Sequence, residues 1–133
     1  MRKNQDLGLL IFRLTLGGLM LLHGIAKIIH GVGGIEGMLS SKGLPTFFAY
    51  GVYIGEVIVP ILLIIGFRTR IAAVVFAFNM FVAMLLAHSG DIFSLSKHGG
   101  WAVELIGLFL FGAIALFFTG GGKYAWSSTH NWD

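Results

Sequence analysis

The sequence predicts an all-α protein, a four-helix transmembrane bundle that forms a single domain over residues 1–133. Four apolar segments predict the spans, at residues 7–29, 47–67, 71–88 and 101–119. Each is close to the ~20 residues that a helix needs to cross a ~30 Å hydrocarbon core. Charged residues make up only 11% of the chain, against roughly 25% in soluble domains. The segments are also apolar all round, whereas the helices of a soluble bundle keep a polar face.

The first segment begins like a secretory leader, but Arg13 interrupts its apolar run and no small-residue cleavage pattern follows closely. We therefore expect a retained helix. Small and basic residues recur along it at steps of 4 and 3, a stripe that drifts only ~20° per heptad. The glycines of the stripe allow a neighbouring helix to approach closely, so its charges should face a helix–helix interface. The stripe consists of Arg13, Gly17, Met20, Gly24, Lys27 and Gly31.

The other three segments each carry isolated polar residues. In the second, Glu56 lies one turn before Pro60, and a proline leaves the carbonyl four residues earlier without its helical donor. The third contains Asn79, which we expect to bond between helices, and ends at His88. The fourth places Glu104 one turn inside its start.

The loops predict the orientation of the chain. With four spans both termini lie on one side, which collects five basic residues, while the opposite loops hold Lys42 and Lys97. The positive-inside rule then places both termini in the cytoplasm of a bacterium, with the chain as a multi-pass protein of the inner membrane. A short amphipathic piece at residues 35–39 is expected on the membrane surface. The five basic residues are Arg2, Lys3, Arg68, Arg70 and Lys123.

Polar residues from all four spans converge on the outer half of the predicted bundle, at ~1.5 Å of depth per residue. They are His23, Lys27, Glu56, His88 and Glu104. Ionisable groups at membrane depth are costly and normally find partners, so we expect Lys27 to pair with Glu56 or Glu104. The cluster predicts a ligand-binding site; the alternative is an ion pair that only fixes helix register. Arg13 lies toward the cytoplasmic side, where its charged end is expected to reach the interface.

The composition argues against several other functions. The chain has no cysteine, hence no disulfide framework and no thiolate-held metal, and no spacing of its other residues predicts a metal site. The basic residues flank apolar runs instead of forming a patch, which argues against nucleic-acid binding. Haem held by His23 and His88 is disfavoured, because their depths differ by about a turn or two and axial ligands must match in depth.

Several short motifs stand in an order and spacing typical of one known family. They are Arg13, His23-Gly24-Ile25-Ala26-Lys27, Gly43-Leu44-Pro45, Gly55-Glu56, Gly66-Phe67-Arg68-Thr69-Arg70, His88, Glu104 and Gly120-Gly121-Gly122-Lys123-Tyr124. On these motifs the chain resembles the DoxX family of small bacterial membrane proteins over nearly its whole length. The segment Ala125-Trp126-Ser127-Ser128 departs from the Ser-Leu-Asp ending expected of the family.

The resemblance implies a subunit of a quinone-linked membrane oxidoreductase that works with a membrane or periplasmic redox partner. The cofactor is not fixed, but a quinone head group is compatible with the polar cluster: His23 and Lys27 would donate hydrogen bonds, and Glu56 or Glu104 would carry protons. Whether the chain is itself an enzyme stays open. Two other functions stay open as well, a non-enzymatic scaffold or accessory protein, and a small transporter that would act as a homo-oligomer.

Overall fold

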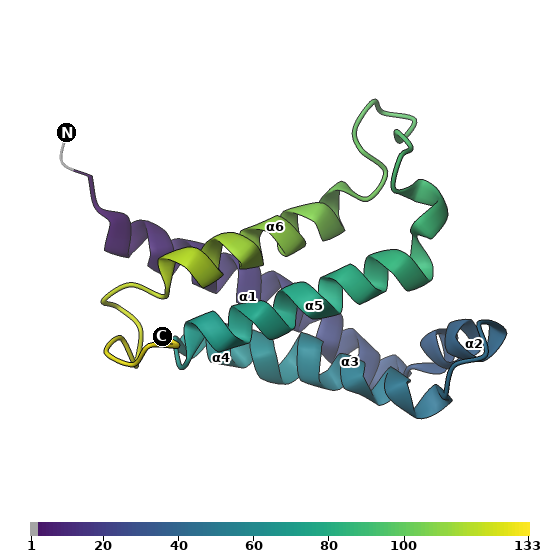
Figure 1. Ribbon diagram of the computed structural model, residues 1–133, viewed down its shortest axis with the longest axis horizontal. Helices are drawn as coiled ribbons and strands as arrows, with labels where there is room; N and C mark the ends of the chain where they lie inside the picture. Colours follow the sequence, from purple (N-terminus) through teal and green to yellow (C-terminus); the bar gives the residue numbers. More distant parts are fainter. Residues whose placement is uncertain (1–2) are drawn as a thin grey trace.

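The computed structural model describes residues 3–133, and this part of the chain is all-helical (Figure 1). The predicted all-α class is therefore confirmed. The long elements are α1 (Gln5–His30), a continuous helical rod (Thr46–Ile65), α5 (Thr69–Ala87) and α6 (Glu104–Thr119). A short helix, α2 (Gly33–Ser41), follows α1. Arg2, which was counted for the orientation, lies outside the described residues.

Three of these helices, α1, the rod and α5, are long and apolar enough to cross a membrane. Helix α6 is also apolar but has 16 residues, because it begins three residues after the predicted start of the fourth span. The residues before it belong to a loop. There Leu95 and Trp101 form an isolated bridge, and the Trp101 indole N–H donates to the Ile92 carbonyl at 2.6 Å.

Local chemistry fixes both ends of α1. The side-chain oxygen of Asn4 accepts from the Leu7 N–H at 3.0 Å and so satisfies one of the free N–H groups of the first turn. At the other end Gly31 adopts a φ of 80°, which favours glycine because it has no Cβ. The Gly31 N–H bonds the Lys27 carbonyl at 2.8 Å, and this ending holds Lys27 in the last turn of the helix.

The rod changes its helical type along its length. A 3-10 turn, η1 (Thr46–Tyr50), leads through α3 (Gly51–Tyr53) into a π-helical turn, η2 (Ile54–Ile58), and then into α4 (Val59–Ile65). Pro60 follows the π turn, and proline has no N–H for the carbonyl four residues back. π-Helical turns are rare in proteins, and those that occur often lie at functional sites. Here the π turn holds Glu56 against α1.

The long helices pack in the order α1, rod, α5, α6. Helix α6 lies mainly against α5, and it meets α1 at Gly112, where a Cβ would lie 2.9 Å from Phe12 Cζ. The start of α1 and residues 120–133 lie at one end of the bundle, while α2 and the loop before α6 lie at the other (Figure 1). The outward faces remain apolar, as expected of helices that face lipid. The buried core contains Leu16, Met20, Val59, Leu63, Phe76, Met80, Phe109 and Leu116.

Arg13 corrects one expectation, because its side chain is fully buried and does not reach the membrane interface. Its Nη1 donates to the carbonyls of Leu63 and Ile64 at 2.9 and 3.2 Å, and its Nε donates to the carbonyl of Gly121 at 3.0 Å. The last four carbonyls of a helix have no partner within the helix, and Arg13 satisfies two of those at the end of α4. The arginine therefore joins α1, α4 and the chain after α6.

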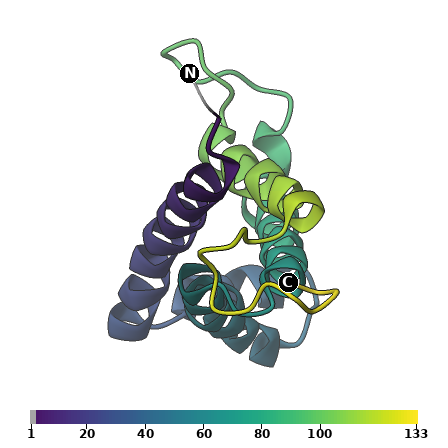
Figure 2. The ribbon, with the colours of Figure 1, turned by 90° about the vertical axis from the view of Figure 1, so that its left-hand side faces the viewer.

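The segment of residues 120–133, here called the tail, folds over the ends of α4 and α5 (Figure 2). The N–H groups of Trp126 and Ser127 donate to the next two carbonyls, those of Ile65 at the end of α4 and of Gly66 just after it, at 3.0 and 3.2 Å. The Trp126 ring also packs on Phe67, with 5.5 Å between the ring centroids. Residues in the part of the tail that departs from the family pattern thus complete the end of α4.

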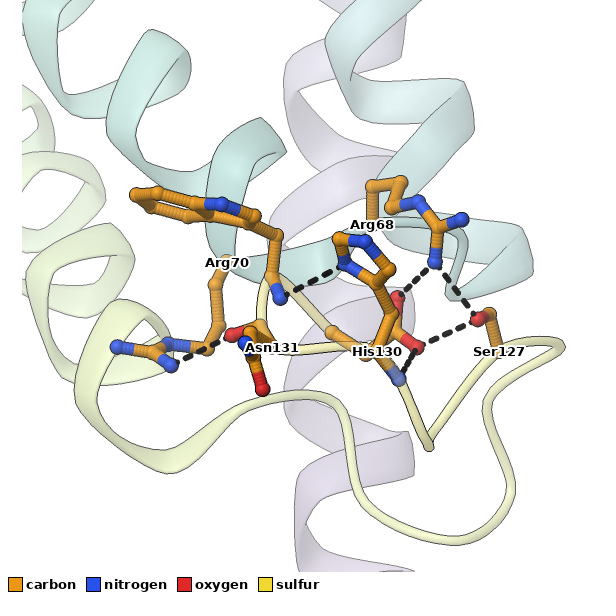
Figure 3. A network of polar contacts seen from close by, with 7 residues as sticks. Arg68, Arg70, Ser127, His130 and Asn131 are labelled. Carbon is orange, nitrogen blue, oxygen red and sulfur yellow. Dashed lines mark hydrogen bonds and ion pairs between the residues drawn. The ribbon is translucent and has the colours of Figure 1, made fainter.

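An ion pair fastens the last residue of the tail (Figure 3). Arg68 Nη1 lies 3.0 Å from Asp133 Oδ1 and 3.2 Å from Ser127 Oγ. The Ser127 hydroxyl and the His130 N–H donate to Asp133 Oδ2 at 2.5 and 2.8 Å. Burial raises the pKa of Asp133, but these hydrogen bonds and the charge of Arg68 outweigh it and lower the pKa from 3.8 to about 2.

Candidate functional site

A cavity of about 380 Å³ lies in the half of the bundle away from the chain ends. All four long helices and α2 contribute to its walls, which are mostly apolar. Five polar side chains interrupt the apolar lining. They are His23 and Lys27 from α1, Glu56 from η2, and Asn79 and His88 from the second half and end of α5. A largely apolar pocket with a few polar groups, in the ~300–1,000 Å³ range, is typical of small-molecule sites.

Lys27 and Glu56 form an ion pair on the cavity wall, with 2.5 Å between Nζ and Oε2. Of the two partners that the sequence left open, Lys27 takes the one on the rod. The Glu56 side chain is 8% exposed and that of Lys27 is 30% exposed, so the pair is buried on the glutamate side and accessible from the lysine side. Tyr53 donates its hydroxyl to the Lys27 carbonyl at 3.2 Å, a second tie between the two elements.

Gly24 allows α1 to come close to the π turn. A Cβ on Gly24 would collide with the backbone carbonyl of Glu56 and would lie 2.8 Å from Val57 Cγ2. The glycine stripe predicted along α1 therefore meets the rod at the residue that pairs with Lys27. Small residues at such positions let membrane helices approach closely, and here the approach sets the position of the carboxylate.

His23 and Asn79 leave hydrogen-bonding groups free at the cavity. Neither side chain forms a hydrogen bond to any other residue in the range 3–133. The His23 ring lies edge-on to Phe109 with 6.3 Å between the centroids. Asn79 packs against Gly55, where a Cβ would lie 2.7 Å from Asn79 Oδ1. Asn79 thus lies between helices as predicted, but its amide is available to a ligand rather than bonded to the rod.

The remaining predicted residues lie at the edge of the cavity or outside it. His88 lines the cavity at the end of α5, and its Nδ1 lies 3.6 Å from Asp91 Oδ2. Glu104 does not line the cavity: it is exposed, and its carboxylate lies beside Gly100. The helix begins at Glu104 instead of one turn earlier, which leaves this carboxylate in the first turn, where the helix dipole favours a negative charge.

Helix α2 contributes two cavity residues that sequence reasoning missed, Ile35 and Met38. The amphipathic pattern at residues 35–39 was the available signal for these two residues. It predicts that the segment has an apolar face, but it does not predict which part of the protein that face contacts. In the structure Leu39 and Val32 pack against Ala49 of η1. This contact turns α2 inward over the cavity. Among residues 3–133, no three His, Asp or Glu side chains come close enough together to hold a metal ion.

Comparison with known proteins adds a family and one distant relative. The sequence profile of the family described as DoxX matches residues 8–89, which run from α1 to the end of α5. The chain is 34% identical over 85 residues to the protein named "Putative oxidoreductase CatD" of Bacillus subtilis (strain 168). That match covers 64% of this chain and 63% of the relative, so the chain spans less than two thirds of the relative's length. No solved structure matches it.

Proposed function

This chain belongs to the DoxX family, and on that premise we propose that it is a subunit of a quinone-linked oxidoreductase system in the bacterial inner membrane. In this proposal four helices cross the membrane with both chain ends in the cytoplasm, and the cavity binds a quinone-like ligand in the outer half of the bundle. The printed name of the relative, "Putative oxidoreductase CatD", supports the redox assignment. A membrane or periplasmic redox protein would be the partner.

One observation carries the proposal: the polar groups at the cavity exceed what helix packing needs. Polar side chains in a membrane bundle are costly unless they find partners. Lys27 and Glu56 satisfy each other, but His23 and Asn79 make no hydrogen bond within residues 3–133. A ligand with an apolar ring and two carbonyl oxygens fits both the apolar walls and these free donors, because it replaces the missing partners.

The cavity residues would have distinct roles. Asn79 and His23 would donate hydrogen bonds to the ligand oxygens and so fix the plane of its ring. The ammonium of Lys27 would donate from the pair, since only one of its three N–H groups is needed by Glu56. Glu56 would hold or release a proton at Oε2. The bound quinone itself would supply the electron-accepting chemistry.

A substitution at His23 tests the proposal. His23→Ala removes a donor without leaving an orphaned formal charge, so the fold should persist. A short-chain quinone analogue should raise the melting temperature of the wild-type protein in detergent, because a ligand that binds only the folded state adds stability with concentration. That increase should shrink in His23→Ala and remain in His30→Ala, a control at the end of the same helix that does not line the cavity.

The second candidate function is a non-enzymatic scaffold. The observation that favours it is the direct contact of Lys27 with Glu56, which satisfies both charges without a ligand and fixes the register of α1 on the rod. Equal quinone responses in wild type and His23→Ala, or no response in either, would support the scaffold. Loss of quinone-coupled electron transfer in His23→Ala membrane vesicles, with the protein still in the membrane, would support the redox site.

A further inference from the structure

A second hollow, of about 610 Å³, lies at the opposite end of the bundle from the cavity, between the tail and the ends of α5 and α6. Arg70 and Lys123 bring two positive charges to it, and the glycine run at residues 120–122 forms part of its floor. His130 and Asn131 of the tail close one side. None of these residues belongs to the candidate site described above, and the proposed function does not use them.

Several contacts hold Arg70 in place, but none of them is with a negatively charged group. Its Nε donates to the Phe117 carbonyl at 2.7 Å. Its Nη1 donates to the Asn131 carbonyl, also at 2.7 Å (Figure 3). Its guanidinium lies 4.8 Å from the centroid of the Phe117 ring and 5.9 Å from that of Trp132. All these partners are neutral, and Nη2 makes no hydrogen bond within residues 3–133. The arginine is therefore fixed in place with donors to spare.

The hollow carries a net positive charge. Within residues 3–133 neither Arg70 nor Lys123 forms an ion pair with a carboxylate. Asp133 also lines the hollow, but Arg68, Ser127 and the His130 N–H already occupy its carboxylate oxygens. Asp6, which does not line the hollow, accepts the backbone N–H of Lys123 at 3.0 Å. The charges of Arg70 and Lys123 are thus left without an anionic partner among residues 3–133.

The surroundings of the hollow indicate the kind of anion. Phe118 lines it and is 76% exposed, and Trp126 and Trp132 lie exposed at the same end of the molecule. Exposed tryptophans are typical of the head-group level of a membrane, and the apolar face of α6 continues from Phe118 toward the bilayer centre. From this combination we infer that the hollow binds the head group of an anionic phospholipid, with the phosphate at Arg70 and Lys123 and the acyl chains along α6.

Lipid addition in detergent tests this site with a matched pair of lysine variants. Phosphatidylglycerol should raise the melting temperature of the wild-type protein in an uncharged detergent, and phosphatidylcholine should not. Lys123→Gln should weaken the apparent affinity for phosphatidylglycerol about fivefold, the equivalent of ~1 kcal/mol for one basic residue at an anionic surface. Lys97→Gln makes the same charge change in the loop before α6 and should leave the affinity unchanged. Arg70→Lys keeps the charge but loses the planar fork, and should also weaken binding.

Three outcomes would overturn the inference. Equal stabilisation by phosphatidylcholine would show that acyl chains alone are bound. Equal loss in Lys123→Gln and Lys97→Gln would show an unspecific response to net charge. Inorganic phosphate that stabilises as strongly as phosphatidylglycerol at equal phosphate concentration would show a site for a free anion instead of a lipid. The Lys123 variant decides the matter even if Arg70→Lys fails to fold, because Lys123 is exposed and its side chain holds no other element.

Discussion

The two cations inside this bundle are held in two different ways, and Arg13 keeps one buried nitrogen, Nη2, without a hydrogen-bond partner within residues 3–133. Lys27 is paired with a carboxylate on the neighbouring helix, whereas Arg13 is surrounded by backbone carbonyls and meets no carboxylate among residues 3–133. The difference follows from position. Arg13 lies beside the end of α4, where carbonyls need donors, and Lys27 lies beside the π turn, which brings Glu56 toward it. Arginine suits the first position because its planar fork donates in several directions at once.

The pair makes a prediction for a double substitution. Lys27→Met leaves the Glu56 charge buried without a partner and should cost about 3 kcal/mol, the low end for a buried pair, because the lysine side chain is 30% exposed. Adding Glu56→Gln should restore part of that loss. Melting temperatures or unfolding free energies in detergent measure both. A double variant no more stable than Lys27→Met would show that the two charges are not coupled.

The lowered pKa of Asp133 predicts how the stability of the protein changes at low pH. Its pKa is about 2 in the folded protein and 3.8 ordinarily, so between these values the unfolded chain binds more protons. The stability that Asp133 contributes is therefore present above about pH 4 and is lost as the pH falls toward 2. Asp133→Asn lacks this contribution at every pH. The difference in melting temperature between wild type and variant should shrink across that window, and a constant difference would contradict the assignment.

At the scale of elements, the sequence predicted the presence of the helices well, but it predicted the contacts between them less well. Long apolar runs leave a chain in lipid few alternatives to helix. The π turn was not predicted, although Pro60 marked the carbonyl that would lose its donor, because one displaced hydrogen bond leaves no periodic signal. The stripe placed Arg13 at a helix–helix interface, but its partners were missed for a similar reason: they are backbone carbonyls, which every residue has. Glu104 was placed too deep because the start of α6 was set three residues early.

Gly24 gives the matching prediction for the contact of α1 with the rod. Gly24→Ala places a Cβ into the Glu56 carbonyl, so the two helices must separate, at the ~1–3 kcal/mol typical of overpacking. The same substitution at Gly18, in the same helix, meets nothing within 4 Å and should be neutral or slightly stabilising, since alanine favours helix. Unfolding measurements in detergent compare the two. Equal effects would show that α1 does not rest closely on the π turn.

The whole molecule is polarised along its length. One end carries the start of α1 and the tail, while the other carries α2 and the loop before α6 (Figure 1). Arg68, Arg70 and Lys123 belong to the first end, and the cavity lies toward the second. Sequence reasoning predicted this division from charge counts and span lengths. It did not predict that the tail would be ordered, because the tail is polar and short, and its order depends on Arg13 of α1, Arg68 of the turn before α5 and Arg70 of α5.

This polarity makes a prediction for membrane orientation. A reporter fused after Asp133 should be active in the cytoplasm, because the basic end is retained there. A reporter inserted at Lys42, in the loop between α2 and the rod, should be active outside. Exchange of Arg68 and Arg70 for glutamine should weaken the preference at both positions, whereas Lys97→Gln should not. The reverse pattern of activities would place the cavity in the inner half of the membrane.

The Arg13 contacts also set an order of events at the ribosome. The carbonyls that Arg13 binds lie 50, 51 and 108 positions later in the chain, so none lies beside it when α1 first enters the membrane. The newly inserted helix carries a charge that costs ~2.5–3.5 kcal/mol at the centre of a bilayer until α4 arrives beside it. Its last partner, Gly121, arrives only after α6 has been made. The contacts of Arg13 therefore require that α1 docks on α4 early and that the tail closes late. We expect quality-control proteases to remove nascent chains that stall before Gly121.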